Sequence, residues 1–182
     1  MQIFKLISVL LDYPSDVALT ELRRAVAGAW SARGLVEAID PERHFAPEEH
    51  LAIADFLDKL LVMDNIDAQA RYVQTFDLTP EHSLHLTHHI FGEEKTRGPA
   101  LIDLTEYLKS YGFTHDEKEL PDYLPLLLEF ASLLEMDEAR VFLADTAKVL
   151  KVIADHLEKA GSPYAALLSI IKNHGSLIKL AA

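Results

Sequence analysis

The chain has no cysteine among its 182 residues. This absence excludes disulfides, thiolate zinc sites, thiolate-ligated iron–sulfur clusters and a cysteine nucleophile. Long apolar runs are also missing, because none approaches the roughly 20 residues that cross a bilayer. The apolar start from Met1 to Leu11 contains Lys5 and lacks a small-residue cleavage site, so it is not typical of a signal peptide. We expect a soluble, cytoplasmic protein without direct membrane insertion.

Basic residues are few, with 17 Lys and Arg against 29 Asp and Glu and a formal charge of −12. Binding to nucleic acid depends on clustered Lys and Arg, so nucleic acid is not an expected partner. The charge favours basic partners. An alternative is that the excess acid serves only to keep the surface soluble.

Alternating strand patterns and the Asn-Gly or Asp-Gly dipeptides of hairpins are missing as well. Helical spacing of apolar residues and helix-capping signals recur instead. The sequence therefore predicts an all-α protein, with residues 1–182 forming a single helical bundle domain of roughly eight to ten helices.

Several helix boundaries can be predicted from capping residues and prolines. A first helix should end at Tyr13-Pro14, and Ser15 should cap a second helix that includes Trp30 and ends near Gly34. Pro47 suits the first turn of a further helix, and Asp64-Asn65 marks the break before the next one.

Four further helices follow from similar signals. Thr79-Pro80-Glu81 should open a helix that lasts until about Gly92. Asp122 is a candidate cap for a helix that begins near Leu124. A long helix should run from about Asp137 to Lys159, and the last helix should carry Tyr164.

Four histidines, His82, His85, His88 and His89, follow one another at spacings of three and four residues. On a helix, His85 would share one face with His82 and with His88 or His89. Two such imidazoles on one face can share a divalent metal, so one hypothesis is a metal-dependent helical enzyme. The His-Glu-x-x-His motif is absent, however, and a polar binding surface or a capping role is the other interpretation. We expect no metal and no catalytic residue.

Arg97-Gly98 forms a separate feature, because a guanidinium at a glycine-permitted bend can bind a carboxylate through two hydrogen bonds. Asp77 and Asp122 are the natural partners for a clamp between two helices. Contact with a ligand is the alternative that the sequence leaves open.

Taken in order, these residues resemble the NarJ-type nitrate reductase molybdenum cofactor assembly chaperones, within the wider TorD and DmsD group of redox enzyme maturation chaperones. The matching pieces are Tyr72-Val73 with Phe76-Asp77, Ser83-Leu84, His89, Gly92-Glu93, Arg97-Gly98, Asp103-Leu104, Tyr107, Gly112, and Glu119-Leu120-Pro121-Asp122 with Leu124-Pro125 and Glu129. They span the middle third of the chain in the order and at the spacing of the family.

The resemblance implies a non-enzymatic chaperone in nitrate assimilation. Its partner would be the apo catalytic subunit of respiratory nitrate reductase, which it would keep competent for molybdenum cofactor insertion before membrane docking. It would assist handling of the cofactor without retaining it, as a monomer or weak dimer. Such proteins bind an N-terminal peptide of the partner, which can enter a groove as a helix.

The expected peptide-binding residues are Tyr72, Phe76, His85, His88, His89, Arg97, Asp122, Tyr123 and Glu129. The residues expected to shape the motif around them are Asp77, Gly98, Leu120, Pro121, Leu124 and Pro125.

Overall fold

The computed structural model describes residues 2–92, 95–114, 116 and 118–176. Within these residues the protein is all-α, as predicted, and contains eleven α-helices. The helices are α1 (Gln2–Leu11), α2 (Asp16–Gly28), α3 (Ala32–Ile39), α4 (Pro47–Val62), α5 (Asn65–Tyr72), α6 (Leu86–Phe91), α7 (Arg97–Ser110), α8 (Leu124–Leu133), α9 (Met136–Ala144), α10 (Ala147–Lys159) and α11 (Tyr164–Ser176). A π-helix (Val73–Asp77) continues α5, and a 3-10 turn (Pro80–His82) follows it.

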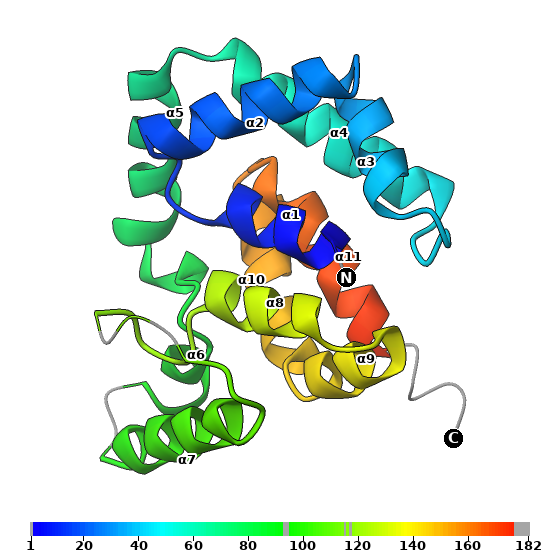
Figure 1. The fold of residues 1–182 in the computed structure, drawn as a ribbon. Helices are drawn as coiled ribbons and strands as arrows, with labels where there is room; N and C mark the ends of the chain where they lie inside the picture. Colours follow the sequence, from blue (N-terminus) through cyan, green and yellow to red (C-terminus); the bar gives the residue numbers. More distant parts are fainter. Residues whose placement is uncertain (1, 93–94, 115, 117, 177–182) are drawn as a thin grey trace.

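Helix α1 lies in the middle of the fold, between α2 and α3 on one side and α8 on the other (Figure 1). Its residues Ile3, Phe4, Ile7 and Leu11 are fully buried. Complete burial of one such side chain contributes roughly 1.5 to 3 kcal/mol. The buried apolar side chains of the described residues, from α1 to α11, form one cluster around this helix.

Local signals placed several helix ends correctly. Helix α1 ends before Pro14, and the Ser15 hydroxyl caps α2 by accepting from the Ala18 N–H at 3.2 Å. Helix α4 begins at Pro47, and α5 begins after Asp64, whose carboxylate accepts from the Ile66 N–H at 2.9 Å. These signals act within four residues, so the sequence alone displays them.

The predicted end of the second helix was wrong. Helix α2 ends at Gly28, and Trp30 turns the chain with a φ of +68°. Ser31 then caps a new helix, because its hydroxyl accepts from the Gly34 N–H at 2.9 Å. Gly34 therefore lies inside α3, where a Cβ would stand 2.4 Å from the Ala29 carbonyl oxygen.

Two predicted long helices are interrupted. The helix that starts at Pro80 is a single 3-10 turn, and α6 begins only at Leu86. The expected helix over 137–159 divides between Ala144 and Ala147, where the Thr146 hydroxyl donates to the Leu143 carbonyl at 2.7 Å. This local hydrogen bond competes with helix continuation, and the break lets both α9 and α10 pack against α11.

None of the helices in the described part of the chain combines the length and apolar character that crossing a membrane requires.

Candidate functional site

Two segments far apart in the sequence cross at the start of α8. The Leu124 N–H donates to the Leu84 carbonyl at 2.9 Å, and the Leu86 N–H donates to the Asp122 carbonyl at 3.1 Å. This short antiparallel pairing, centred on His85 and Tyr123, prevents a continuous helix from Pro80 to Gly92. It brings the histidine-rich segment against the Leu120–Pro125 segment.

Asp122 is fully buried at this crossing. Its carboxylate accepts from the Thr87 N–H at 3.0 Å, from the Thr87 hydroxyl and from His85 Nδ1 at 3.2 Å. The Thr87 N–H lies in the first turn of α6, so Asp122 caps α6 from a distant segment. The prediction that Asp122 caps the helix beginning at Leu124 was therefore wrong, and Tyr123 holds that position without a capping hydrogen bond from its side chain.

Arg97 forms the predicted clamp with Asp122. Its Nη2 lies 3.6 Å from Asp122 Oδ2, and its Nε donates to the Thr87 hydroxyl at 2.9 Å. Arg97 begins α7, so the contact fastens α7 to the start of α8. The predicted bend at Gly98 was wrong, because Gly98 lies in the first turn of α7 and has no positive φ. A Cβ at Gly98 would meet no described atom within 4 Å.

Tyr123 is held by hydroxyl contacts from two other segments. Its Oη lies 3.0 Å from Asp12 Oδ1 and 2.8 Å from Tyr72 Oη, which also lies 3.2 Å from the Leu11 carbonyl. Because a carboxylate only accepts, Tyr123 donates to Asp12, and the single Tyr72 hydroxyl hydrogen is shared between Tyr123 and Leu11. Burial raises the pKa of Tyr123, and the neighbouring Tyr72 and Asp12 raise this pKa further. The Tyr123 side chain therefore stays a neutral phenol. The His85 ring packs beside it with centroids 5.2 Å apart.

Two cavities share Tyr123 in their lining. One cavity has a volume of about 250 Å³ and lies between the ends of α1 and α5 and the crossing. The other has a volume of about 330 Å³ and lies between α1, α8 and the segment that precedes α8. Both are lined by Asp12, Glu119 and Tyr123, and we call the pair the Tyr123 groove. The other lining residues include Tyr13, Tyr72, Phe76, Asp77, His85, Phe113, Asp116 and Glu129.

The groove is acidic and aromatic. Its described lining contains the carboxylates of Asp12, Asp77, Asp116, Glu119 and Glu129, and neither Lys nor Arg. Glu129 pairs with Lys5, which lies outside this lining. Chemically, the groove suits a ligand that carries positive charge next to apolar groups.

The structure brings together only part of the predicted site. Tyr72, Phe76, His85, Tyr123 and Glu129 line the groove, although Tyr72 and Phe76 are largely buried. Asp122 lies beneath it as a support. Among the described residues, His88, His89 and Arg97 line neither cavity, and His89 instead contacts the Ser83 carbonyl at 2.7 Å.

Three of the six residues expected to shape the motif lie in the core near the crossing. Pro121, Leu124 and Pro125 are buried, whereas Leu120 is 41% exposed. The Pro125 carbonyl accepts from the Ser8 hydroxyl at 2.7 Å, which joins α8 to α1. Asp77 ends the π-helix at the rim of the groove. Glu93 lies outside the described residues.

Sequence reasoning missed Asp12, Asp116 and Glu119. Asp12 reaches Tyr123 across more than a hundred residues of chain, and no spacing rule connects the two. Glu119 was noted only as the first residue of the Glu119-Leu120-Pro121-Asp122 motif and not as a binding residue.

The histidines do not gather around one point. His82 contacts the Thr75 carbonyl, His85 contacts Asp122, and His89 contacts the Ser83 carbonyl. No group of three or more metal-ligating side chains with a suitable arrangement occurs within residues 2–92, 95–114, 116 and 118–176. The metal hypothesis thus has no geometric support in the described structure.

The order of these segments along the chain fits a known family. Residues 42–169 match the family of nitrate reductase delta subunits. The chain belongs to this family. The resemblance to the NarJ-type chaperones is confirmed by this match together with the relatives that follow.

Three relatives illustrate the similarity. The chain is 35% identical over 166 residues to the nitrate reductase molybdenum cofactor assembly chaperone NarJ of Escherichia coli K12, covering 91% of this chain and 66% of that protein. It is 32% identical over 171 residues to the probable assembly chaperone NarW of the same strain, covering 94% and 67%. It is 40% identical over 100 residues to the probable chaperone NarJ of Bacillus subtilis, covering 55% and 54%.

The chain thus spans about two thirds of the length of the E. coli relatives. The range that matches the family model contains the crossing with Asp122 and Tyr123. Asp12 and the helices α1 to α3 come before this range.

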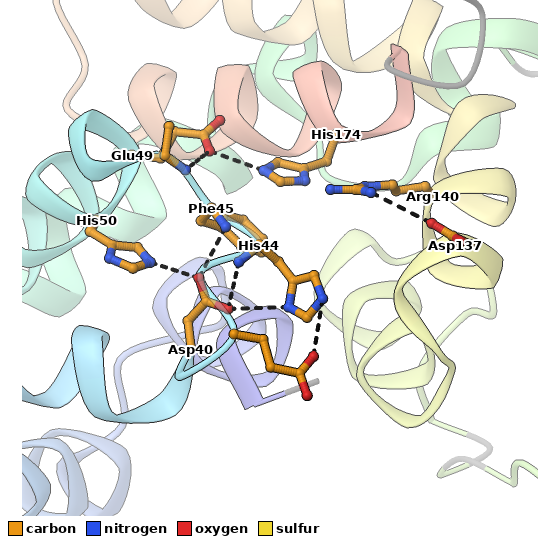
Figure 2. A network of polar contacts seen from close by, with 10 residues as sticks. Asp40, His44, Phe45, Glu49, His50, Asp137, Arg140 and His174 are labelled. Atoms are coloured by element: carbon orange, nitrogen blue, oxygen red, sulfur yellow. Dashed lines mark hydrogen bonds and ion pairs between the residues drawn. The ribbon is translucent and has the colours of Figure 1, made fainter. Parts of the chain in front are cut away.

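A second polar network holds the loop between α3 and α4 (Figure 2). Asp40 is buried and accepts from the backbone N–H groups of His44 at 3.1 Å and Phe45 at 3.0 Å. The His50 ring contacts the same carboxylate at 2.8 Å. One acid therefore fixes the loop to the first turns of α4.

The same loop is joined to α11 through Phe45. Its ring stacks on the buried His174 with centroids 3.9 Å apart and an interplanar angle of 27°. His174 Nε2 lies 3.0 Å from Glu49 Oε2 (Figure 2). These contacts lie away from the Tyr123 groove and stabilise the fold.

We expect the hydrogen-bonded carboxylates of Asp40, Glu49 and Asp122 to make the protein less stable at acidic pH. Burial alone would raise the pKa of Asp40, but the hydrogen bonds from Phe45, His50 and His44 outweigh it and hold the pKa below its ordinary value. The pKa values of Glu49 and Asp122 are lowered in the same way. A carboxyl whose pKa is lower in the folded chain than in the unfolded chain stabilises the fold at pH values above its unfolded pKa, which is about 4. This contribution is lost as the pH falls through the folded pKa.

The free energy of unfolding from urea titrations should therefore decline as the pH is lowered from about 6 to about 3. Asp40→Asn should be less stable at neutral pH and show a shallower decline. Asp58→Asn, at an exposed position on α4, should keep the wild-type slope. Parallel pH curves for all three proteins would contradict this assignment.

Proposed function

We propose that the chain is a chaperone for the apo catalytic subunit of respiratory nitrate reductase. It binds the N-terminal peptide of that subunit in the Tyr123 groove and keeps the subunit competent for molybdenum cofactor insertion before membrane docking. It takes part in handling the cofactor without retaining it, and it is not an enzyme. The names of the E. coli and B. subtilis relatives support the chaperone role, and the lining of the groove supports the peptide site.

The observation that carries the peptide site is the composition of the groove. Its described lining has five carboxylates, of which only Glu129 is paired with a lysine, and neither Lys nor Arg, so a basic peptide gains favourable electrostatic interactions there. These interactions weaken with salt, because the Debye length is about 8 Å at physiological ionic strength.

Aromatic walls supply the apolar part of the binding. Tyr123 is partly exposed and lines both cavities, whereas Tyr13 lines one cavity and Phe113 lines the other. An amphipathic helix that inserts two or three apolar side chains gains roughly 1.5 to 3 kcal/mol for each fully buried one, before association costs reduce the sum. Moderate, reversible binding follows, which suits a chaperone that must release its client.

Contacts within the fold hold the Tyr123 side chain in place without a peptide. The Tyr123 hydroxyl contacts Asp12 and Tyr72, and the crossing beneath it is fastened by Asp122. A preformed site lowers the ordering cost of binding. The peptide therefore meets a fixed aromatic ring that lines both acidic cavities.

The proposal is tested by calorimetric titration with a peptide from the N-terminus of the catalytic subunit, and with a scrambled peptide as control. Saturable binding of the true peptide alone is expected. Tyr123→Ala should weaken it about tenfold, which corresponds to about 1.4 kcal/mol. Tyr123→Phe should retain more of the affinity, because it keeps the ring and loses only the hydroxyl contacts.

Charge variants separate the electrostatic part. Asp12→Asn combined with Glu119→Gln should reduce affinity at low salt and flatten its salt dependence, whereas Asp58→Asn should change neither. If the wild-type protein does not bind the peptide at low salt, or if the scrambled peptide binds equally well, the peptide site is wrong.

A further inference from the structure

A further cavity, of about 360 Å³, lies between α6, α7, α8, α9 and α10, and we call it the α7–α9 pocket. Eight of the twelve residues that line it are apolar or aromatic, and its volume lies within the range of about 300 to 1,000 Å³ that is usual for ligand sites. Helices α6 and α7 lie at the lower left of Figure 1, with α9 at the lower right. The pocket shares no lining residue with the Tyr123 groove, so it is a separate site that the proposed function leaves unassigned.

Aromatic and aliphatic side chains form the walls of this pocket. The Tyr107 ring of α7 lies parallel to the Phe142 ring of α9, with centroids 5.9 Å apart and an interplanar angle of 2°. Ile90 on α6 and Val141 on α9 also line the pocket, and each is 58% exposed. Contiguous apolar surface that reaches solvent marks a site of interaction. Because the apolar surface extends out of the pocket, it suits a protein segment better than an enclosed small molecule.

Two acids flank the apolar walls. Asp145 lines the pocket, and Glu138 lies seven residues earlier on the same face of α9. A hydrogen bond with Tyr111 and burial raise the pKa of Tyr107 to about 12, and the negative charges of Glu138 and Asp145 raise it further, which shows that both carboxylates lie near this ring. Neither acid forms an ion pair in the described part of the chain, where the ion pairs of α9 and α10 belong to other residues.

The charge of the pocket selects its occupant. The charged residues of its described lining are Asp145 and Asp122, and only Asp122 has its charge offset by an arginine, Arg97. An anionic ligand or lipid headgroup is therefore disfavoured, and a second copy of the chain would bring a like charge of −12. The described residues contain no strand to which an extended segment could add, whereas a helix can lay its apolar face into a groove between helices.

We propose that the α7–α9 pocket binds an amphipathic helix of a partner protein. The apolar side chains of this helix contact Tyr107 and Phe142, and Lys or Arg residues next to its apolar face pair with Glu138 and Asp145. The requirement concerns one local segment, so it holds whatever the net charge of the whole partner. The inference goes beyond the proposed function, which places a peptide in the Tyr123 groove.

The experiment titrates the full chain calorimetrically with two synthetic helical peptides that share one leucine-rich face. Lysines flank this face in the first peptide, and glutamates replace them in the second. The lysine peptide should bind the wild-type protein and the glutamate peptide should not. Val141→Lys should weaken binding of the lysine peptide about tenfold, because the substitution places a positive charge at the pocket. Leu51→Lys is the matched control, since Leu51 is also 58% exposed on a helix, α4, and it should bind like the wild type.

Neutral variants isolate the role of the two acids. Glu138→Gln combined with Asp145→Asn should lower the affinity for the lysine peptide at low salt and flatten its salt dependence. Glu48→Gln combined with Asp58→Asn removes two exposed acids of α4 and should change neither. The inference is overturned if both peptides bind equally well, or if the two double variants behave alike.

Cross-tests separate this pocket from the Tyr123 groove. Tyr123→Ala should leave the affinity for the lysine peptide unchanged, and Val141→Lys should leave the affinity for the N-terminal peptide of the catalytic subunit unchanged. Equal affinities of Val141→Lys and Leu51→Lys for the lysine peptide overturn the inference. If Val141→Lys weakens the N-terminal peptide and Tyr123→Ala does not, the Tyr123 site of the proposed function is wrong and the α7–α9 pocket is supported.

Discussion

Asp122→Ala should lower the free energy of unfolding by about 3 kcal/mol, the lower end of the range for removing one partner of a buried ion pair, because the Arg97 side chain is 26% exposed. Asp122 is fully buried and is the shared acceptor for Thr87, His85 and Arg97. Its loss leaves the Arg97 guanidinium without its carboxylate and the first turn of α6 without its cap. The value is obtained from urea unfolding curves recorded at neutral pH.

Two variants make the result specific. Asp122→Asn should lose less, because an amide oxygen still accepts from Thr87 but does not neutralise Arg97. Asp137→Ala removes an acid that lies 3.6 Å from Arg140 with its side chain 95% exposed, and should cost less than about 1 kcal/mol. An Asp122→Ala loss as small as that of Asp137→Ala would show that the crossing is not held by this acid.

Gly175→Ala should destabilise the fold by about 2 kcal/mol, within the range for overpacking a close contact. A Cβ at Gly175 would stand 2.6 Å from the Leu143 carbonyl oxygen and 2.8 Å from its carbon, both backbone atoms of α9. Helices α9 and α11 would have to separate, because neither contact can be relieved by a side-chain rotation. The measurement is again the free energy of unfolding from urea.

Gly28→Ala is the matched control, also a helical glycine, at the end of α2, with no described atom within 4 Å of the place a Cβ would take. It should stabilise the chain by up to about 1 kcal/mol through the higher helix propensity of alanine. Equal effects of the two substitutions would mean that α9 and α11 do not approach so closely.

The groove was only partly predictable from the sequence. Tyr72, His85 and Tyr123 were singled out and do line it, but Asp12 was not, and Arg97 proved to pair with Asp122 outside the lining of the groove. The type of a residue suggests what it can bind, whereas its direction depends on the segments that pack around it. Asp122 shows the difference, because the same carboxylate was expected to cap α8 and instead caps α6.

The sequence by itself determined the all-α class, the family and the helix ends at Pro14, Ser15, Pro47 and Asp64, since these depend on composition, residue order and hydrogen bonds within four residues. Only the tertiary structure decided where the predicted long helices break and how the groove forms. The Leu84–Leu86 segment gives up helical hydrogen bonds to pair with Asp122 and Leu124, nearly forty residues away. Such a choice depends on the free energy of the whole packed core, which no local pattern contains.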